Sequence, residues 1–178
     1  MRIISGKARG AKLSAPDGLD TRPTLDRVRE AIFSMLFGAM ERAYVLDLFA
    51  GTGAMGLEAL SRGAEGADFV DNSRLACECV RANIEKTRLE GANVFNTDFK
   101  AFLQNCSRKY DIIFLDPPYE AGYYGVALDI IKERGLLSSD GIIVAECDDP
   151  EGFDARGFEI DRQRKYGKAA VYLLKASS

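Results

Sequence analysis

The order of apolar runs and turn residues predicts an α/β fold with a mostly parallel, seven-stranded sheet. We expect helices on both faces of this sheet and an antiparallel hairpin at its C-terminal edge. Between residues 44 and 147, short apolar runs alternate with segments of helical periodicity, which requires crossover connections between parallel strands. The last two apolar runs are joined only by a short link around Gly167, so they must pair as a hairpin.

The individual elements follow from the same pattern. The first helix has apolar positions at helical spacing, is capped by Thr24 or Asp26 after Pro23, and runs to about Phe37. Ser73 or Asn72 caps a later helix. The expected strands are 44–49, 67–71, 93–96, 111–116, 141–147, 158–163 and 169–175. The helices between them are 55–61, 73–89, 99–106 and 123–133.

Length and composition indicate one globular domain over residues 1–178, with a basic N-terminal arm at about 1–23. Hydrophobic residues make up 47% of the chain, enough for a core. No run approaches the roughly 20 apolar residues of a membrane span, and residues 1–12 lack a secretory apolar stretch. We therefore expect a cytoplasmic protein, and a monomer.

The residues that are missing exclude several chemistries. The four cysteines form no CxxC pair and the chain has no histidine, so no zinc or other metal site is expected. Without histidine, the Ser-His-Asp and Cys-His hydrolase mechanisms are also excluded. Any reaction must therefore proceed without an imidazole.

Charge is distributed unevenly along the chain. The net charge is -3, but the first 30 residues carry +3 and the remainder -6. A basic arm on an acidic body can contact nucleic-acid phosphates, although a solvated terminus would have the same composition. The candidate RNA-binding residues are Arg2, Lys7, Arg9, Lys12, Arg22 and Arg27.

A glycine loop follows the first strand of the sheet, with glycines at 51, 53 and 56 in the spacing GxGxxG. Glycine lets a strand turn sharply into a helix while its backbone passes close to a ligand. This spacing alone fits NAD as well as S-adenosylmethionine. The candidate cofactor-binding residues here are Asp47, Phe49, Ala50, Gly51, Thr52 and Gly53.

Acidic residues at three strand ends favour S-adenosylmethionine. Asp47 precedes the glycines, where it would repel a pyrophosphate but attract the ammonium of the methionine end. Asp71, beside Asn72, can accept the ribose hydroxyls. Asp98 with Phe99 can contact the adenine. Helix capping is the other interpretation of Asp47 and Asp98. A parallel sheet that ends in an antiparallel hairpin is likewise typical of class I, Rossmann-like methyltransferases.

The segment Asp116-Pro117-Pro118-Tyr119 ends the fourth strand and is the candidate catalytic motif. Two prolines stop the strand and stiffen the loop. The Asp116 carboxylate and the Pro117 carbonyl could accept both hydrogens of an exocyclic amine, which would direct the nitrogen lone pair at a methyl group. Tyr119 offers a face on which a base can stack, worth roughly 1–3 kcal/mol. A turn with a capping aspartate is the alternative.

These segments resemble the bacterial RsmD-type family of 16S ribosomal RNA guanine-N2 methyltransferases. Similar stretches are 1–10, 22–33, 47–63 and 116–119, and the resemblance covers nearly the whole chain. It implies an S-adenosylmethionine-dependent reaction at the N2 of a guanine in small-subunit ribosomal RNA, on an assembled particle. The resemblance also implies base binding by 116–119 and RNA contacts by the arm. Ala8 and Ala11 stand where larger or basic residues are expected.

Other functions remain open from the residues alone. A DNA or other RNA amino-methyltransferase would share the motifs, but a DNA enzyme usually carries a recognition domain. A protein-glutamine methyltransferase would be expected to have Asn in place of Asp116. An NAD oxidoreductase would need a substrate domain and a proton donor. A non-catalytic RNA-binding ribosome assembly factor would bind the cofactor without turnover.

Overall fold

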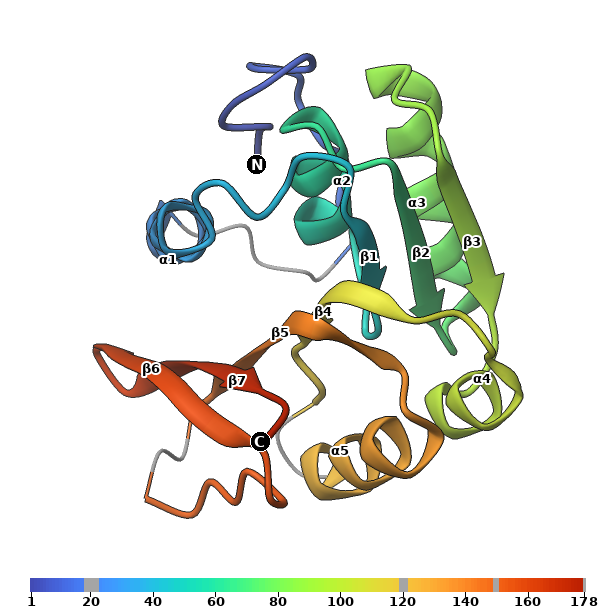
Figure 1. Cartoon of the computed structure of the whole chain (residues 1–178). Coiled ribbons are helices and arrows are strands. Elements are labelled where there is room, and N and C mark those ends of the chain that lie inside the picture. Colours follow the sequence, from blue (N-terminus) through green and yellow to red (C-terminus); the bar gives the residue numbers. More distant parts are fainter. Residues whose placement is uncertain (18–22, 119–121, 149–150, 178) are drawn as a thin grey trace.

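A computed structural model describes residues 1–17, 23–118, 122–148 and 151–177, and these residues form one seven-stranded sheet (Figure 1). The strand order is β3-β2-β1-β4-β5-β7-β6. Neighbouring strands from β3 to β5 are parallel, whereas β7 is antiparallel to both β5 and β6. This confirms the predicted fold class. The strands are β1 (Tyr44–Asp47), β2 (Gly66–Asp71), β3 (Ala92–Asn96), β4 (Tyr110–Leu115), β5 (Leu137–Cys147), β6 (Glu159–Tyr166) and β7 (Ala169–Lys175).

Helices cover both faces of the sheet. They are α1 (Pro23–Met35), α2 (Ala54–Ser61), α3 (Arg74–Thr87), α4 (Phe99–Asn105) and α5 (Tyr123–Arg134). One apolar core joins α1, α2, α3 and the N-terminal arm to one face, and a second core joins α4 and α5 to the other. Within the described ranges, no helix combines the length and apolar character that membrane crossing requires.

Helix α1 covers the half of the sheet that contains β4, β5 and β7. The rings of Phe33 on α1 and Phe114 on β4 lie 5.7 Å apart between centroids. The helix begins at Pro23, so Asp26 lies inside its first turn and is not the cap expected from the sequence. Proline suits the first helical position because it lacks the amide hydrogen that would have no partner there. The helix also ends at Met35, two residues before the expected end.

The start of α3 agrees with the sequence pattern, whereas the start of β5 differs from it. Ser73 caps α3 as expected, accepting from the amide of Ala76 at 3.3 Å. Strand β5 begins at Leu137, four residues before the expected start, because its first residues pair with Tyr110 ahead of a register shift. The polar start of β5 conceals this extension in the sequence, where Ser138 and Asp140 suggest a turn.

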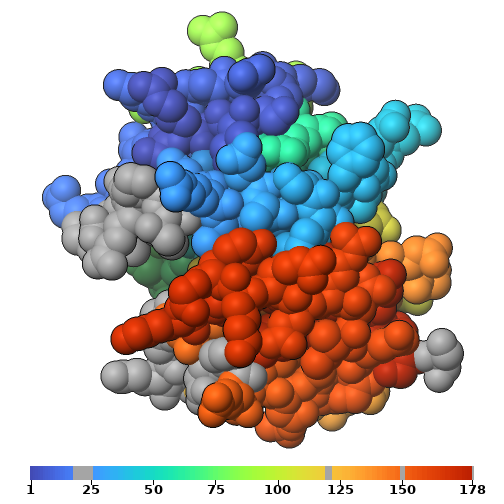
Figure 2. Space-filling model, turned by 90° about the vertical axis from the view of Figure 1, so that its left-hand side faces the viewer, coloured from blue at the N-terminus to red at the C-terminus, as the bar shows by residue number. Residues whose placement is uncertain are grey.

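The N-terminal arm is folded against the body of the protein. Its two sides bridge at Arg2 and Lys12 in antiparallel fashion, so the arm turns back on itself as a small hairpin. Ile3 and Leu13 are buried in the same core as α1 and α2. Figure 2 shows the face on which the arm, α1 and the β6–β7 hairpin form successive bands from top to bottom.

Candidate active site

A cavity of about 200 Å³ lies where β1, β4 and β5 end. The carboxyl ends of parallel strands are the usual ligand site of such sheets. Five of the six cofactor-binding candidates around the glycine loop line this cavity, as does Asp116. The complete lining is Met1, Asp26, Arg29, Asp47, Phe49, Ala50, Gly51, Thr52, Ala54, Met55, Phe114, Asp116 and Glu146.

The three positions in the loop require glycine for different structural reasons. Gly51 and Gly53 have φ of 56° and 78°, in the left-handed region that disfavours a side chain. Gly53 is also the N-cap of α2. A Cβ on Gly56 would lie 2.3 Å from the ring of Phe69, so this glycine permits close packing of α2 on β2. The loop therefore places Gly51 in the cavity wall and packs the start of α2 closely against β2.

Asp47 is buried beneath the loop, with 4% of its surface exposed. Its Oδ2 accepts a hydrogen bond from the amide of Gly56, in the first turn of α2, at 3.0 Å, although the N-cap of that helix is Gly53. Burial raises the pKa of Asp47 to about 7. The hydrogen bond from Gly56 lowers this pKa, whereas the negative charges of Asp116 and Asp71 raise it further. A cation in the cavity would therefore stabilise the ionised carboxylate.

The candidates that follow β2 and β3 lie outside this cavity. Asp71 accepts from the amides of Gly51 and Ser73, each at 2.9 Å, which fixes its carboxylate beside the loop. Asp98 caps α4 by accepting from the amides of Lys100 and Ala101. The ring of Phe99 is buried 5.1 Å from that of Phe49. Asn72 is exposed next to Asp71.

The candidate catalytic motif begins where β4 ends. Pro117 is buried and Pro118 is exposed, and Tyr119 lies outside the described residues. Asp116 is an exposed residue that lies at the cavity wall. Partial desolvation by the surrounding protein, and secondarily the carboxylate of Asp148, raise the pKa of Asp116 to about 6.

Glu146 is a cavity residue that sequence reasoning missed. Leu115 and Ala145 are register partners in β4 and β5, so Asp116 and Glu146 follow them as neighbours on the same face. Burial raises the pKa of Glu146 to about 8, and the negative charge of Asp116 is the second largest cause of this increase. Alternation along 141–147 was the available signal, since Glu146 interrupts an otherwise apolar strand.

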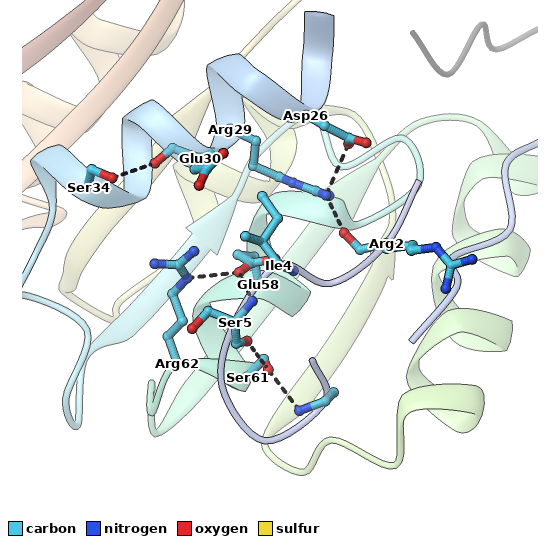
Figure 3. Close-up of polar contacts among 11 residues, drawn as sticks. Arg2, Ile4, Ser5, Asp26, Arg29, Glu30, Ser34, Glu58, Ser61 and Arg62 are labelled. Carbon is cyan, nitrogen blue, oxygen red and sulfur yellow. Dashed lines mark hydrogen bonds and ion pairs between the residues drawn. The ribbon is translucent and has the colours of Figure 1, made fainter. Parts of the chain in front are cut away.

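Buried polar side chains that also escaped sequence analysis hold the arm, and Glu58 and Asn83 are two of them. Glu58, fully buried on α2, accepts from the amides of Ile4 at 2.8 Å and Ser5 at 3.0 Å, and from Arg62 Nε at 2.8 Å (Figure 3). Asn83 on α3 accepts from the amide of Ser14 at 2.8 Å.

Asn83 also connects the arm with the glycine loop. Its Nδ2 donates to the carbonyl oxygens of Ser14 at 2.9 Å and Thr52 at 3.0 Å. At the start of the arm, the sulfur of Met1 lies 3.6 Å from Thr52 Oγ1, and Met1 forms part of the cavity wall. The arm thus completes the cavity, in addition to the RNA contacts expected for it.

Five of the basic candidates are exposed, and Arg22 lies outside the described residues. Arg2, Lys7, Arg9 and Lys12 lie on the arm, and Arg27 lies on α1. Arg2 Nη1 donates to the carbonyl of Gly10 at 3.2 Å within the arm. Arm and helix are adjacent bands in Figure 2.

Fold and site together define a Rossmann-like methyltransferase. A solved structure titled "Putative methyltransferase yhhF from Escherichia coli" superposes with a TM-score of 0.89 at 31% identity, covering 100% of this chain and 99% of that one. A family profile described as "Conserved hypothetical protein 95" matches residues 1–175.

Curated relatives identify the family further. Ribosomal RNA small subunit methyltransferase D of Escherichia coli strain K12 is 34% identical over 98% of this chain and 89% of its own length. The putative rRNA methyltransferase YlbH of Bacillus subtilis is 41% identical over 98% of both chains. The chain therefore belongs to this methyltransferase family, the RsmD family, as its sequence segments indicated.

Proposed function

We propose that this protein transfers a methyl group from S-adenosylmethionine to the exocyclic N2 of a guanine in small-subunit (16S) ribosomal RNA. The observation that carries the proposal is the shared cavity, where the glycine loop with Asp47 meets Asp116 at the next strand end. The names of the relatives from Escherichia coli and Bacillus subtilis support an rRNA substrate.

The described residues fit the cofactor. Asp47 offers a buried carboxylate for its ammonium, the loop at Gly51 leaves room for a closely approaching ligand, and Asp71 stands beside the loop for ribose hydroxyls. The cavity itself holds only part of so large a molecule, because Asp71, Asp98 and Phe99 lie outside its wall. We assign the methionine end and the methyl group to the cavity, and the adenosine to the surface beyond it.

Asp116 and Pro117 would orient the target amine. With its two N–H groups donating to the Asp116 carboxylate and the Pro117 carbonyl, the nitrogen lone pair leaves conjugation and points into the cavity. When bound, the cofactor would supply a methyl carbon on a positively charged sulfur, and transfer would form a C–N bond as the C–S bond breaks to leave a neutral thioether. Alignment of the two centres contributes effective molarities on the order of 10⁵ M.

The carboxylates of Asp116 and Glu146 stabilise the positive charge that develops on nitrogen. The displaced proton leaves to water, so no histidine is needed. A base inside a helix cannot reach a cavity of this kind, and the target is therefore unpaired or flipped out.

We propose that exposed arm residues and Arg27 bind RNA phosphates. We also propose that residues 1–178 act as a single-domain monomer and that the protein meets its ribosomal substrate in the cytoplasm.

Methyl transfer from labelled S-adenosylmethionine to undermethylated small ribosomal subunits tests the proposal directly. We expect labelled N2-methylguanosine after nucleoside analysis, with assembled subunits a better substrate than naked RNA. A different labelled nucleoside would assign another amino-methyltransferase activity. Cofactor binding without transfer, beside an active control enzyme, would instead support a non-catalytic assembly factor.

A further inference from the structure

Arg29 on α1 is a buried cation whose hydrogen bonding is incomplete. The residue is 4% exposed. Its Nη2 donates to the backbone carbonyl of Arg2 and to Asp26 Oδ1, the latter at 3.2 Å (Figure 3). Within the described part of the chain, Nε and Nη1 are buried and have no hydrogen-bond partner. A buried donor without an acceptor costs free energy, more so in a charged group.

The position of Arg29 suggests what completes its bonding. The side chain lines the cavity that also contains Asp47, Gly51 and Asp116. The charges of Glu58 and Asp26 stabilise the guanidinium, and Asp26 forms an ion pair with it. The cavity wall therefore combines this buried guanidinium with the buried carboxylate of Asp47, beside the further acids Asp116 and Glu146.

A free amino-acid group has the complementary charges. Its ammonium and carboxylate are attached to one carbon, so a site that binds it needs an anion and a cation close together. An RNA phosphate fits less well, because a cavity of about 200 Å³ has no room for a nucleic-acid backbone.

We propose that Arg29 binds the carboxylate of the methionine end of S-adenosylmethionine, while Asp47 binds its ammonium. This role of Arg29 rests on the proposed function, because it requires that S-adenosylmethionine is the cofactor. It makes Arg29 the residue that distinguishes this cofactor from an analogue without the carboxylate. Because Arg29 Nη2 also holds the carbonyl of Arg2, ligand binding and the position of the arm depend on the same guanidinium. Charge-assisted bonds to guanidinium are the strong class of hydrogen bond.

The test compares two ligands by isothermal titration calorimetry. One is S-adenosylhomocysteine, and the other is its decarboxylated analogue, which keeps the adenosine, sulfur and amine. We expect wild-type protein to prefer the first by about 10- to 100-fold. Arg29→Gln should remove this preference by weakening S-adenosylhomocysteine alone. Arg29→Lys should retain part of it, since it keeps the charge but loses the planar group.

Matched controls separate binding from folding. Arg74→Gln changes an exposed arginine on α3 and should alter neither affinity. Equal weakening of both ligands in Arg29→Gln would overturn the proposal and give Arg29 only a packing role under the arm. Equal affinity of wild-type protein for both ligands would overturn it even if the glutamine variant failed to fold. Absence of any S-adenosylhomocysteine binding by wild-type protein would instead contradict the proposed function.

Discussion

Glu58, in the second half of α2, accepts a 2.8 Å hydrogen bond from the backbone amide of Ile4, fifty-four residues earlier in the chain. The same carboxylate binds the amide of Ser5 and the guanidinium of Arg62. Three donors converge on one fully buried anion, so the arm is anchored by charge and hydrogen bonding as well as by Ile3.

Loss of this anchor should destabilise the protein. Glu58→Ala leaves three part-buried donors without their acceptor and should lower the free energy of unfolding by roughly 1–3 kcal/mol. Chemical denaturation measures this value. Glu78→Ala, which removes an exposed acid paired with Arg74 on α3, should change it by less than about 0.5 kcal/mol. Similar losses in both variants would show that Glu58 has no special role.

Asp116 should be required for transfer and dispensable for cofactor binding. Asp116→Ala removes an acceptor for the target amine and a charge beside the developing cation, so we expect transfer to become undetectable. Asp116→Asn, which keeps the shape, should lower the rate about 10²- to 10³-fold. Calorimetry with S-adenosylhomocysteine should give affinities near those of wild-type protein. Near-normal activity of the alanine variant would exclude the proposed role.

Transfer should decrease as the pH falls. The carboxylates act in their ionised form, and the pKa values of Asp116, Asp47 and Glu146 are raised to about 6, 7 and 8. Each is protonated progressively below its pKa, so activity should decline between about pH 8 and 6. The measurement is the pH profile of kcat/KM.

Asp148 provides the matching control for that profile. Its carboxylate contributes to the raised pKa of Asp116. Asp148→Asn removes this repulsion, so ionisation of Asp116 becomes easier and the acidic limb of the profile should move to lower pH. A profile that stays unchanged, or moves to higher pH, would contradict this electrostatic coupling.

The exposed basic residues of the arm should determine the salt dependence of substrate binding. Neutralising Arg2, Lys7, Arg9 and Lys12 together should weaken binding to undermethylated small subunits. Each lost phosphate contact should reduce the slope of log affinity against log salt by about 0.7–0.9. Binding titrations at several salt concentrations measure this slope, with unfolding curves as a check on structure. An identical slope would mean that these side chains are only solvated.

Much of the fold could be predicted from the sequence because strand and helix periodicities are strong in this chain. The order of elements from β1 to β7 and the pairing of β7 with β6 required only apolar patterning and link lengths. The glycine loop and Asp116 were each predicted at the end of a strand, and the carboxyl ends of neighbouring parallel strands share an edge.

The remaining parts depend on contacts between distant segments. Glu58 and Asn83 look like ordinary polar positions on helices, and nothing local shows that the arm covers them. Arg29 likewise sits among charged residues of a surface-type helix, yet it is buried. From the sequence, Asp98 could contact the adenine or cap a helix, and in the structure it forms the capping hydrogen bonds of α4. Only tertiary packing distinguishes such cases, because the same residue type serves a solvated surface and a buried network.

Since the side chain of Met1 forms part of the cavity wall, a peptide fused ahead of that residue would emerge beside the ligand. The choice of purification tag is then a biochemical variable. A tag placed before Met1 adds groups that compete for, or obstruct, the space next to Thr52, whereas one appended after β7 leaves that wall as it is. Affinities measured with the first kind of protein would describe an altered pocket.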